Sequence, residues 1–570
     1  MCFVVSQAYF FSFFVCKMSE CPIVQTVNGK VKGKACLKAK PNESNQVFRY
    51  ASIPFAKPPL GELRFEPPER SEPWQGILDG TKMSPRPLQD EAFEEELYGN
   101  LPLLNQFEEN LSDFSEDCLY LTVYTSNPSA TANMPVIVWI PGGAFLVGGG
   151  SLRDGQVLCG LHDLVLVVPN YRLSLYGFFT TGKNTKYPGN MGLLDQIMAF
   201  EWTRDNIQKF GGDPNNITVA GQSAGAVSVG LHMISPMSQR LFHKAILCSC
   251  AATSPCLLKD NYSEILKLHL EALGVKETEP SAIAAKLKSI SAEEIREKTK
   301  HLHILQSFFV SVDGQFLKTL PSKPNFAPEF LAPVPILLGC TSSEGAGMLK
   351  DAFSVIFPSA HSEEEWSDEA KKALLTIKPS LNDKELENVV ERLNAIYAKS
   401  FPGEDAHNPQ RKISALASDP EFLFPAIELA SLQSDRGHGS FLYQMTQKLK
   451  CFHDDEYAIE TRKKDDFCEC DHCDCLLFTF GISLANGKKR KQCKFTGEEE
   501  KLARIWMTYL SNFAAYGNPN KGEAVEMQWP QYDVKSRRHL VVRVPLAEDN
   551  HLVHDRYQWW KSFNDDDFGN

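Results

Sequence analysis

The chain has 570 residues, 43% of them hydrophobic, so it is long enough to bury a large core. Its formal net charge of −12 and its pI near 5.7 argue against a nucleic-acid partner, because such a partner needs a basic protein face. Its 16 cysteines are too sparse in a chain of this length to indicate a disulfide-built scaffold.

The first residues leave two interpretations open. Residues 2–16 form an apolar stretch that is as long as the core of a signal peptide and too short to span a bilayer. No basic residue precedes it and no small-x-small cleavage site follows it, so Met18 is an alternative start. We predict a leader or an upstream-start extension over residues 1–17, a single domain over residues 22–562, and no stable membrane insertion.

The first part of the chain alternates predicted strands with helical sequence. Residues 22–35 read as a hairpin with its turn at Asn28-Gly29, and the acidic residues 86–114 as an irregular surface excursion. Continuous apolar runs, typical of strands covered on both faces, and then a helix follow at 134–140, 164–168 and 188–200. This alternation predicts an α/β fold with a mostly parallel central sheet flanked by helices.

The second part adds charged, helix-rich segments to this pattern. Residues 258–300 and 361–400 are predicted to be helical cap insertions. Further strands are predicted at 333–339, 440–444 and 539–544. Residues 498–518 form an amphipathic helix with an apolar inner face at Leu502, Ile505, Trp506, Tyr509, Leu510 and Phe513.

A Gly-x-Ser-x-Gly segment lies between an apolar, β-branched run and small residues that can open a helix. The run is 217–220, and the segment is Gly221-Gln222-Ser223-Ala224-Gly225. In a strand–turn–helix setting this motif is a nucleophile elbow, which holds a serine hydroxyl clear of the sheet. An ordinary glycine turn is the alternative, because the motif is common by chance. The choice depends on finding an acid and a histidine in workable order.

An acid follows the elbow in the order that α/β-hydrolases use, namely Ser, acid, His. Glu344 comes just after the apolar strand predicted at 333–339, at the strand end where open α/β sheets build their sites. That position favours a catalytic role over a solvated surface charge. Among 14 histidines, His472 is one of several possible bases on the residue pattern alone.

From about Val24 to Trp560, the chain resembles the type-B carboxylesterase family, which includes cholinesterases, juvenile hormone esterases and liver-type carboxylesterases. The resemblance rests on the elbow and on six ordered segments: Pro58-Pro59-Leu60-Gly61-Glu62-Leu63-Arg64-Phe65, Ser115-Glu116-Asp117-Cys118-Leu119-Tyr120-Leu121, Asn170-Tyr171-Arg172-Leu173, Gly189-Asn190-Met191-Gly192-Leu193-Leu194-Asp195-Gln196, Phe210-Gly211-Gly212-Asp213-Pro214 and Ser343-Glu344-Gly345. It implies the α/β-hydrolase fold.

The resemblance also implies a catalytic triad. Ser223 would be the nucleophile, Glu344 the orienting acid and His472 the general base. A serine hydroxyl needs such partners because it is a poor nucleophile near neutral pH.

Five further positions follow from the resemblance. The oxyanion hole would be formed by backbone N–H groups of Gly143, Ala144 and Ala224, whose small side chains leave the amides open. Gln222 and Ser249 would lie just behind the triad.

Two structural ion pairs are also implied, Arg64 with Glu116 and Arg172 with Asp195. They would belong to the scaffold and take no part in the chemistry.

The sequence departs from the family's pattern at three places. Pro141 stands where many relatives have the histidine of Trp-Ile-His-Gly-Gly, and the loop around His472 lacks the usual Gly-x-x-His-Gly-Asp-Glu pattern. The family's two usual disulfides also have no matching pairs, since Cys118 has no cysteine in its expected partner region, 84–88. Missing bridges favour a reducing compartment, so we predict a cytoplasmic protein, with secretion or the ER lumen as the alternative if residues 1–17 act as a signal.

The cysteines near His472 allow a rival interpretation. Cys468, Cys470, Cys473 and Cys475 with His472 are the ligand types of a zinc site, and Cys451 or Cys493 could add to them. Structural zinc normally takes two ligand pairs from separate turns, whereas these residues all lie close together. We therefore predict reduced thiols, no metal and no cofactor.

The predicted function is a serine carboxylic ester hydrolase that acts on small to medium apolar esters of xenobiotic, lipid or hormone type. The alternative is a catalytically silent relative that binds a ligand or mediates adhesion. The presence of all three triad residues favours the enzyme. Acetylcholine is disfavoured as a substrate because residues 107–110 carry no aromatic beyond Phe107 to hold a quaternary ammonium. The sequence does not predict an oligomeric state.

Overall fold

The computed structural model describes most of the chain. The described residues are 21–36, 45–98, 113–254, 257–302, 306–321, 331–347, 349–350, 358–378, 380–401, 403–454, 456–457, 463–485 and 494–564. All structural statements below refer to these residues.

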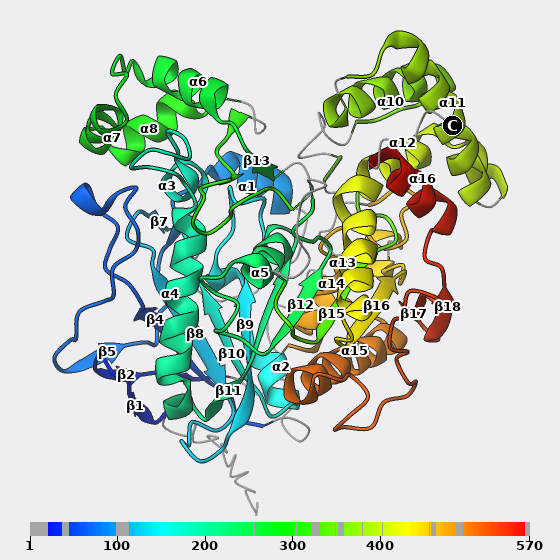
Figure 1. Cartoon of the computed structure of the whole chain (residues 1–570). Coiled ribbons are helices and arrows are strands. Elements are labelled where there is room, and N and C mark those ends of the chain that lie inside the picture. Colours follow the sequence, from blue (N-terminus) through cyan, green and yellow to red (C-terminus); the bar gives the residue numbers. More distant parts are fainter. Residues whose placement is uncertain are drawn as a thin grey trace, which may run out of the picture.

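The centre of the molecule is a twisted sheet with helices on both faces (Figure 1). Within the described ranges it has eleven strands in the order β18-β17-β16-β15-β12-β11-β9-β10-β8-β4-β3. In chain order the bounds are β3 Lys34–Ala35, β4 Phe48–Pro54, β8 Tyr120–Thr125, β9 Met134–Ile140, β10 Val165–Pro169, β11 Gly212–Gln222, β12 Lys244–Cys248, β15 Ile336–Thr341, β16 Ser440–Met445, β17 Arg538–Val542 and β18 Ala547–Asn550. From β10 through β17 neighbouring strands are parallel, and the outer pairs are antiparallel. The predicted α/β fold is confirmed.

The central strands are apolar because both of their faces are covered. Every residue of β10, β12 and β15 is buried, and β9 is buried except for Pro135. The apolar run predicted at 134–140 coincides with β9, and the run predicted at 164–168 coincides with β10 to within one residue. A fully covered parallel strand has no polar face, which is why these runs were recognisable.

Helices α4 Met191–Asn206, α5 Ala224–Ile234, α13 Phe424–Asp435 and α15 Gly497–Tyr516 flank the sheet (Figure 1). The sequence sets both ends of α15. Thr496 and Glu499 form a reciprocal capping box at its start, and Gly517 ends it in the left-handed conformation at φ 66°. Shorter helices are α2 Gln156–Leu161, α3 Ser174–Phe178 and α14 Asp474–Thr479.

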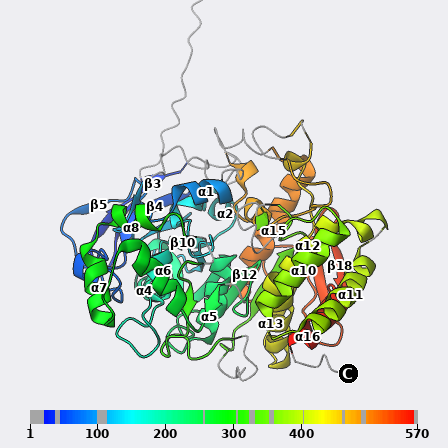
Figure 2. The ribbon, with the colours of Figure 1, turned by 90° about the horizontal axis from the view of Figure 1, so that it is seen from above.

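Two groups of helices lie at one end of the sheet, as the predicted cap insertions require. In Figure 1 one group is at the upper left and the other at the upper right. The first contains α6 Ser263–Leu273, α7 Pro280–Ser289 and α8 Ala292–Thr299, near the short parallel strands β13 Leu258–Lys259 and β14 Val310–Ser311. The second contains α10 Glu363–Ile377, α11 Asp383–Ser400, α12 Pro409–Ser418 and α16 His554–Asn564, which share an apolar cluster separate from the main core. Figure 2 shows the two groups from above, on either side of the molecule.

The hairpin at the start of the chain is confirmed. Strands β1 Ile23–Gln25 and β2 Lys30–Lys32 pair antiparallel across the Asn28-Gly29 turn, and β5 Ile77–Asp79 joins them.

Two sequence predictions need correction. Within 86–114 the structure has helix α1 Glu91–Tyr98 and a parallel pair of β6 Arg86–Pro87 with β7 Phe114–Ser115, held by a buried Arg86–Glu94 ion pair. The helix predicted at 188–200 starts at Met191, because Gly189 and Asn190 precede it with φ of 105° and 67°.

The two predicted scaffold ion pairs are present. Arg64 Nε and Nη2 each lie 2.6 Å from a carboxylate oxygen of Glu116, and Arg172 Nη2 lies 2.7 Å from Asp195 Oδ1. Each arginine also donates to backbone carbonyls, so both pairs tie distant loops together.

A separate finding concerns membranes. Among the described residues, no helix combines the length and the apolar character needed to cross a bilayer.

Candidate active site

The predicted site residues follow the carboxyl ends of four neighbouring parallel strands. Gly143 comes after β9, Ser223 directly after β11, Ser249 directly after β12, and Glu344 after β15. Parallel strands end on the same edge of a sheet, so four segments far apart in the chain are brought to one place.

Ser223 stands on a strained turn between β11 and α5. Its φ of 58° and ψ of −129° are rare for a residue with a side chain. The two motif glycines permit the turn because neither has room for a side chain. A Cβ added to Gly221 would lie 2.4 Å from backbone atoms of Gly225, and a Cβ added to Gly225 would lie 2.2 Å from the Ile140 carbonyl oxygen. The Ser223 amide donates to the Cys248 carbonyl at 3.0 Å, and its side chain is half-buried. This is the geometry of a nucleophile elbow.

The loop after β9 presents its backbone toward the elbow. Gly143, Ala144 and Phe145 all have positive φ, of 119°, 55° and 61°. A Cβ added to Gly142 would lie 2.4 Å from the Gln222 carbonyl oxygen, so the loop is pressed against the turn. Among the described residues no hydrogen bond uses the amides of Gly143 or Ala144.

The amide of Ala224 also lies in this region. It is at the first position of α5, where a helix leaves its N–H groups without internal partners. Open amides at this edge suit an oxyanion, because main-chain donors are already fixed before charge develops.

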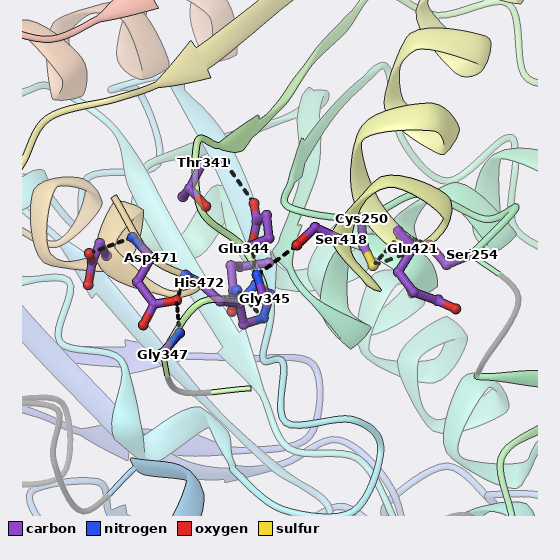
Figure 3. Close-up of polar contacts among 12 residues, drawn as sticks. Cys250, Ser254, Thr341, Glu344, Gly345, Gly347, Ser418, Glu421, Asp471 and His472 are labelled. Atoms are coloured by element: carbon purple, nitrogen blue, oxygen red, sulfur yellow. Dashed lines mark hydrogen bonds and ion pairs between the residues drawn. The ribbon is translucent and has the colours of Figure 1, made fainter. Parts of the chain in front are cut away.

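Glu344 and His472 form a short buried contact (Figure 3). His472 Nδ1 lies 2.5 Å from Glu344 Oε2, and both residues are 1% exposed. The other carboxylate oxygen, Oε1, accepts from the Thr341 amide at 2.7 Å. The acid is therefore held from one side by its own strand end and from the other by the imidazole.

The second ring nitrogen of His472 faces Gln222. His472 Nε2 lies 3.0 Å from Gln222 Nε2, and the Phe422 ring packs on the imidazole with centroids 5.1 Å apart. An imidazole that donates Nδ1–H to Glu344 keeps a lone pair on Nε2, to which the Gln222 amide can donate. This arrangement selects the tautomer that a general base needs.

The surroundings of His472 act in opposite directions on its pKa. Burial lowers the pKa, whereas Cys473 and the Glu344 carboxylate, which both contact the ring, raise it above 6.5. We take the net direction as upward, because a carboxylate at hydrogen-bond distance stabilises the imidazolium directly.

The structure thus brings Glu344, His472 and Gln222 into contact beside the elbow. In the described part of the chain, no hydrogen bond joins the Ser223 hydroxyl to His472, and Gln222 occupies Nε2. Serine–histidine contacts are often loose without substrate. Ser249 is buried at the end of β12 with φ 55°, and its amide donates to the Gly339 carbonyl at 2.8 Å.

The cysteine cluster around His472 is built of free thiols. Cys468, Cys470, Cys473 and Cys475 are all buried and unoxidised. Among the described residues, no group of three or more His, Cys, Asp or Glu side chains is arranged to hold a metal ion.

Two further cysteines bear on the sequence predictions. Cys451, considered above as an extra zinc ligand, is disulfide-bonded, which removes its thiolate from metal binding. Cys118 is free, in agreement with the predicted loss of a family disulfide.

Several residues that support the site were not identified from the sequence. Ser418 accepts the Gly345 amide at 2.8 Å and so ties the Glu344 loop to α12 (Figure 3). Lys464, Asp471 and Asp474 form a buried charge network beside His472. The two aspartates flank the histidine closely in sequence, but nothing in the sequence indicates that they are buried against a lysine.

A doubly wound sheet with a serine elbow at its carboxyl edge, and a Glu–His pair beside it, defines the class of α/β-hydrolases.

Comparison with known proteins identifies the family within this class. The carboxylesterase family profile matches residues 20–560. The chain is 34% identical over 552 residues to a human (Homo sapiens) cocaine esterase, covering 95% of this chain and 91% of the relative. It is 34% identical over 550 residues to an acylcarnitine hydrolase of Mus musculus, covering 95% and 90%, and 33% identical over 554 residues to the pyrethroid hydrolase Ces2e of Rattus norvegicus, again covering 95% and 90%.

The chain belongs to the carboxylesterase family, and it is a carboxylic ester hydrolase.

Proposed function

We propose that the protein hydrolyses esters through a Ser223–His472–Glu344 triad and an acyl-enzyme. The single observation that carries the proposal is the buried 2.5 Å contact between His472 Nδ1 and Glu344 Oε2 beside the Ser223 elbow. A buried carboxylate on Nδ1 fixes the ring's tautomer and stabilises the imidazolium that forms when the ring takes a proton.

The reaction has two halves. Ser223 Oγ attacks the ester carbonyl carbon while His472 Nε2 takes the hydroxyl proton, and the amides of Gly143, Ala144 and Ala224 stabilise the oxyanion. The imidazolium then gives that proton to the leaving alcohol. In the second half, water attacks the acyl-enzyme with His472 as base, which releases the acid and regenerates the Ser223 hydroxyl.

Gln222 competes with the Ser223 hydroxyl for His472 Nε2. His472 Nε2 has one lone pair, which the Gln222 amide contacts in the resting structure. The amide must give up that contact as the Ser223 hydroxyl moves onto Nε2.

The proposed substrates are small to medium apolar carboxylic esters of xenobiotic, lipid or hormone type. Apolar residues near the catalytic groups support this class: Phe422 packs on His472, and Phe145, Leu146 and Val147 follow the oxyanion loop in buried positions. The relatives named above include proteins named for the hydrolysis of cocaine, acylcarnitines and pyrethroids.

The cytoplasmic location remains a prediction. Reduced, buried cysteines such as Cys118, Cys248 and Cys340 support a reducing compartment, and the disulfide at Cys451 is the observation that stands against it.

The test is pre-steady-state hydrolysis of a p-nitrophenyl ester by purified protein. We expect a burst of p-nitrophenol equal to the enzyme concentration, followed by slower turnover, and we expect Ser223→Ala to abolish both. The matched control is Ser228→Ala, which removes a buried hydroxyl from α5; in the described part of the chain this hydroxyl donates to the Ala224 carbonyl and accepts from the Gln196 amide. Turnover that persists in folded Ser223→Ala would contradict the proposed triad, and a folded wild-type protein with neither a burst nor turnover would favour the catalytically silent alternative.

A further inference from the structure

A buried lysine lies beside the catalytic histidine. The Lys464 side chain is 10% exposed, and its Nζ contacts both carboxylate oxygens of Asp474, at 2.7 and 2.9 Å. The same Nζ lies 3.4 Å from Asp471 Oδ2 and 3.9 Å from the centroid of the Phe452 ring. The ammonium therefore faces two carboxylates and an aromatic ring, with almost no access to water.

The two aspartates connect this ammonium to both catalytic loops. Asp474 Oδ2 accepts the Asp471 amide at 2.8 Å. Asp471 Oδ1 accepts the His472 amide at 2.8 Å and the Gly347 amide at 3.3 Å. Figure 3 shows Asp471 between His472 and Gly347. One carboxylate thus holds the backbone of the base and the backbone of the loop that carries Glu344.

The same two loops touch along their backbones as well. Ser343 pairs with Asp471 as a parallel bridge, and its amide donates to the Cys470 carbonyl at 2.9 Å. A Cβ added to Gly347 would lie 2.2 Å from Asp471 Oδ2, so the Glu344 loop is in close contact with this carboxylate. A movement of Asp471 therefore changes the position of Glu344 relative to His472.

The lysine supplies the counter-charge for these two carboxylates. Asp471 and Asp474 are 0% and 1% exposed, and two carboxylates so close together in the interior repel each other unless a cation lies between them. Burial raises the pKa of Asp474, Lys464 lowers it and Asp471 raises it. The net result is a pKa of about 6. Without the ammonium, two buried carboxylates would lie close together with no cation between them, and their positions against the backbone N–H groups would change.

We propose that Lys464 is a positioning residue, which holds His472 and Glu344 at their catalytic separation through Asp471 and Asp474. The inference rests on the proposed function, since it concerns the same Glu–His pair. It adds a residue that contacts neither the substrate nor the triad side chains.

The molecule offers a matched control in a second buried lysine. Lys412 is 1% exposed, bonds to both carboxylate oxygens of Glu363 and lies 5.1 Å from the centroid of the Trp366 ring. Lys412 is thus a second buried lysine with a carboxylate and an aromatic ring beside it, although it has one carboxylate where Lys464 has two, and it lies in the separate helical group of α10, α11 and α12. Among the described residues, the side-chain hydrogen bonds and ion pairs of Lys412 go to Glu363 and Asn394, and none of these reaches the Glu344 or His472 loop. Lys412 lies in the same helix as Ser418, so a loss of Tm in Lys412→Met also measures any general disturbance of α12.

The experiment compares Lys464→Met with Lys412→Met in the full chain, with Tm, kcat and KM for a p-nitrophenyl ester and the rate of phosphonylation by a fluorophosphonate. We expect both variants to lose Tm. Lys464→Met alone should lose about 10- to 100-fold in kcat and in phosphonylation rate, since small misplacements of catalytic groups have effects of that size. Its KM should change less than about 3-fold, because Lys464 makes no contact that binds the substrate in the ground state. Lys464→Arg, which keeps the charge, should recover part of the lost kcat.

Two results would overturn the proposal: a folded Lys464→Met with wild-type kcat, or an equal loss of kcat in Lys412→Met at the same loss of Tm. If Lys464→Met does not fold, Lys464→Gln gives the same comparison, with a loss of kcat expected and its absence decisive against the proposal. Failure of the underlying function is separately visible, because wild-type protein would then lack a burst that depends on Ser223.

Discussion

The two halves of the proposed active site are built by different means. The Ser223 half consists of strained backbone: the elbow at φ 58° and the Gly143–Phe145 loop with three positive φ angles, closed by glycines at which no Cβ fits. The Glu344–His472 half consists of buried charge, in which Lys464, Asp471 and Asp474 hold the backbone behind the acid and the base. The first half should therefore be sensitive to side-chain volume, and the second to charge.

After the loss expected for Ser223→Ala, the next largest effect on turnover should come from neutralising the acid. Glu344→Gln keeps the size of the side chain but no longer stabilises the His472 imidazolium, so kcat should fall by about 10³- to 10⁴-fold, as in other triads. Stopped-flow and steady-state ester hydrolysis measure this loss. The matched control is Glu523→Gln, which changes a His162–Glu523 contact of 2.7 Å elsewhere on the molecule and should leave kcat unchanged. If kcat fell less than 10-fold in Glu344→Gln, the negative charge of Glu344 would not be needed for His472 to act as the base.

A smaller effect on turnover, with a clear effect on stability, should follow from adding volume at the elbow. In Gly225→Ala the new Cβ meets the Ile140 carbonyl oxygen at 2.2 Å, so the turn must shift. We expect a loss of about 2–4 kcal/mol in the free energy of unfolding, typical of overpacking a rigid site. The accompanying loss of kcat should be about 10- to 100-fold, since Ser223 moves with the turn.

Gly497→Ala is the control for this change. Beyond its chain neighbours and its own helix, no atom of the described residues lies within 4 Å of a Cβ added there, so its denaturation curve should match the wild type. If the denaturation curves of Gly225→Ala and Gly497→Ala were the same, the elbow would tolerate an added side chain, which contradicts our explanation of why it needs glycine.

The pH profile should change when Cys473 is replaced. Cys473 and Glu344 raise the pKa of His472 against the effect of burial, and the base must be neutral to act, so kcat/KM should rise with pH through a limb above 6.5. Cys473→Gly removes one of the two raising contributions, which moves this limb to lower pH. Glycine also fits the φ of 71° at this position.

The control for the pH profile is Cys159→Ala, a buried free cysteine away from the site, which should leave the limb in place. A limb that stays fixed in Cys473→Gly, or moves to higher pH, would show that the thiol does not act on the base.

The smallest effect should come from metal removal. Both ring nitrogens of His472 face protein groups, Glu344 and Gln222, so treatment with EDTA or 1,10-phenanthroline should leave kcat within error of the untreated enzyme. A chelator-dependent loss that zinc restores would revive the zinc interpretation of the cysteine cluster.

The same division between backbone and charge explains what the sequence could predict. Met134–Ile140 and the elbow were recognisable because local rules govern them: a covered strand is apolar throughout, and a tight turn needs glycine. Glu344 followed from its place after a buried strand. His472 could be chosen from 14 histidines only through the family resemblance.

Buried charges obey no such local rule. Lys464 lies in a polar segment whose sequence is typical of a solvent-exposed loop. Nothing in the sequence marks its partners Asp471 and Asp474 as buried either. Glu94 was likewise placed in an irregular acidic surface, although it is 4% exposed and pairs with Arg86. These ion pairs join residues only eight and ten positions apart, yet one sequence does not record which nearby opposite charges are buried together and which remain in solvent.

The central claim is that Ser223 is the nucleophile activated by the Glu344–His472 pair. Its most direct test is to treat the folded enzyme with a fluorophosphonate and map the adduct by peptide mass spectrometry. We predict one adduct per chain, on Ser223, with the rate of labelling reduced at least 100-fold in His472→Ala. Labelling of another residue, or of Ser223 at an unchanged rate in His472→Ala, would contradict the account.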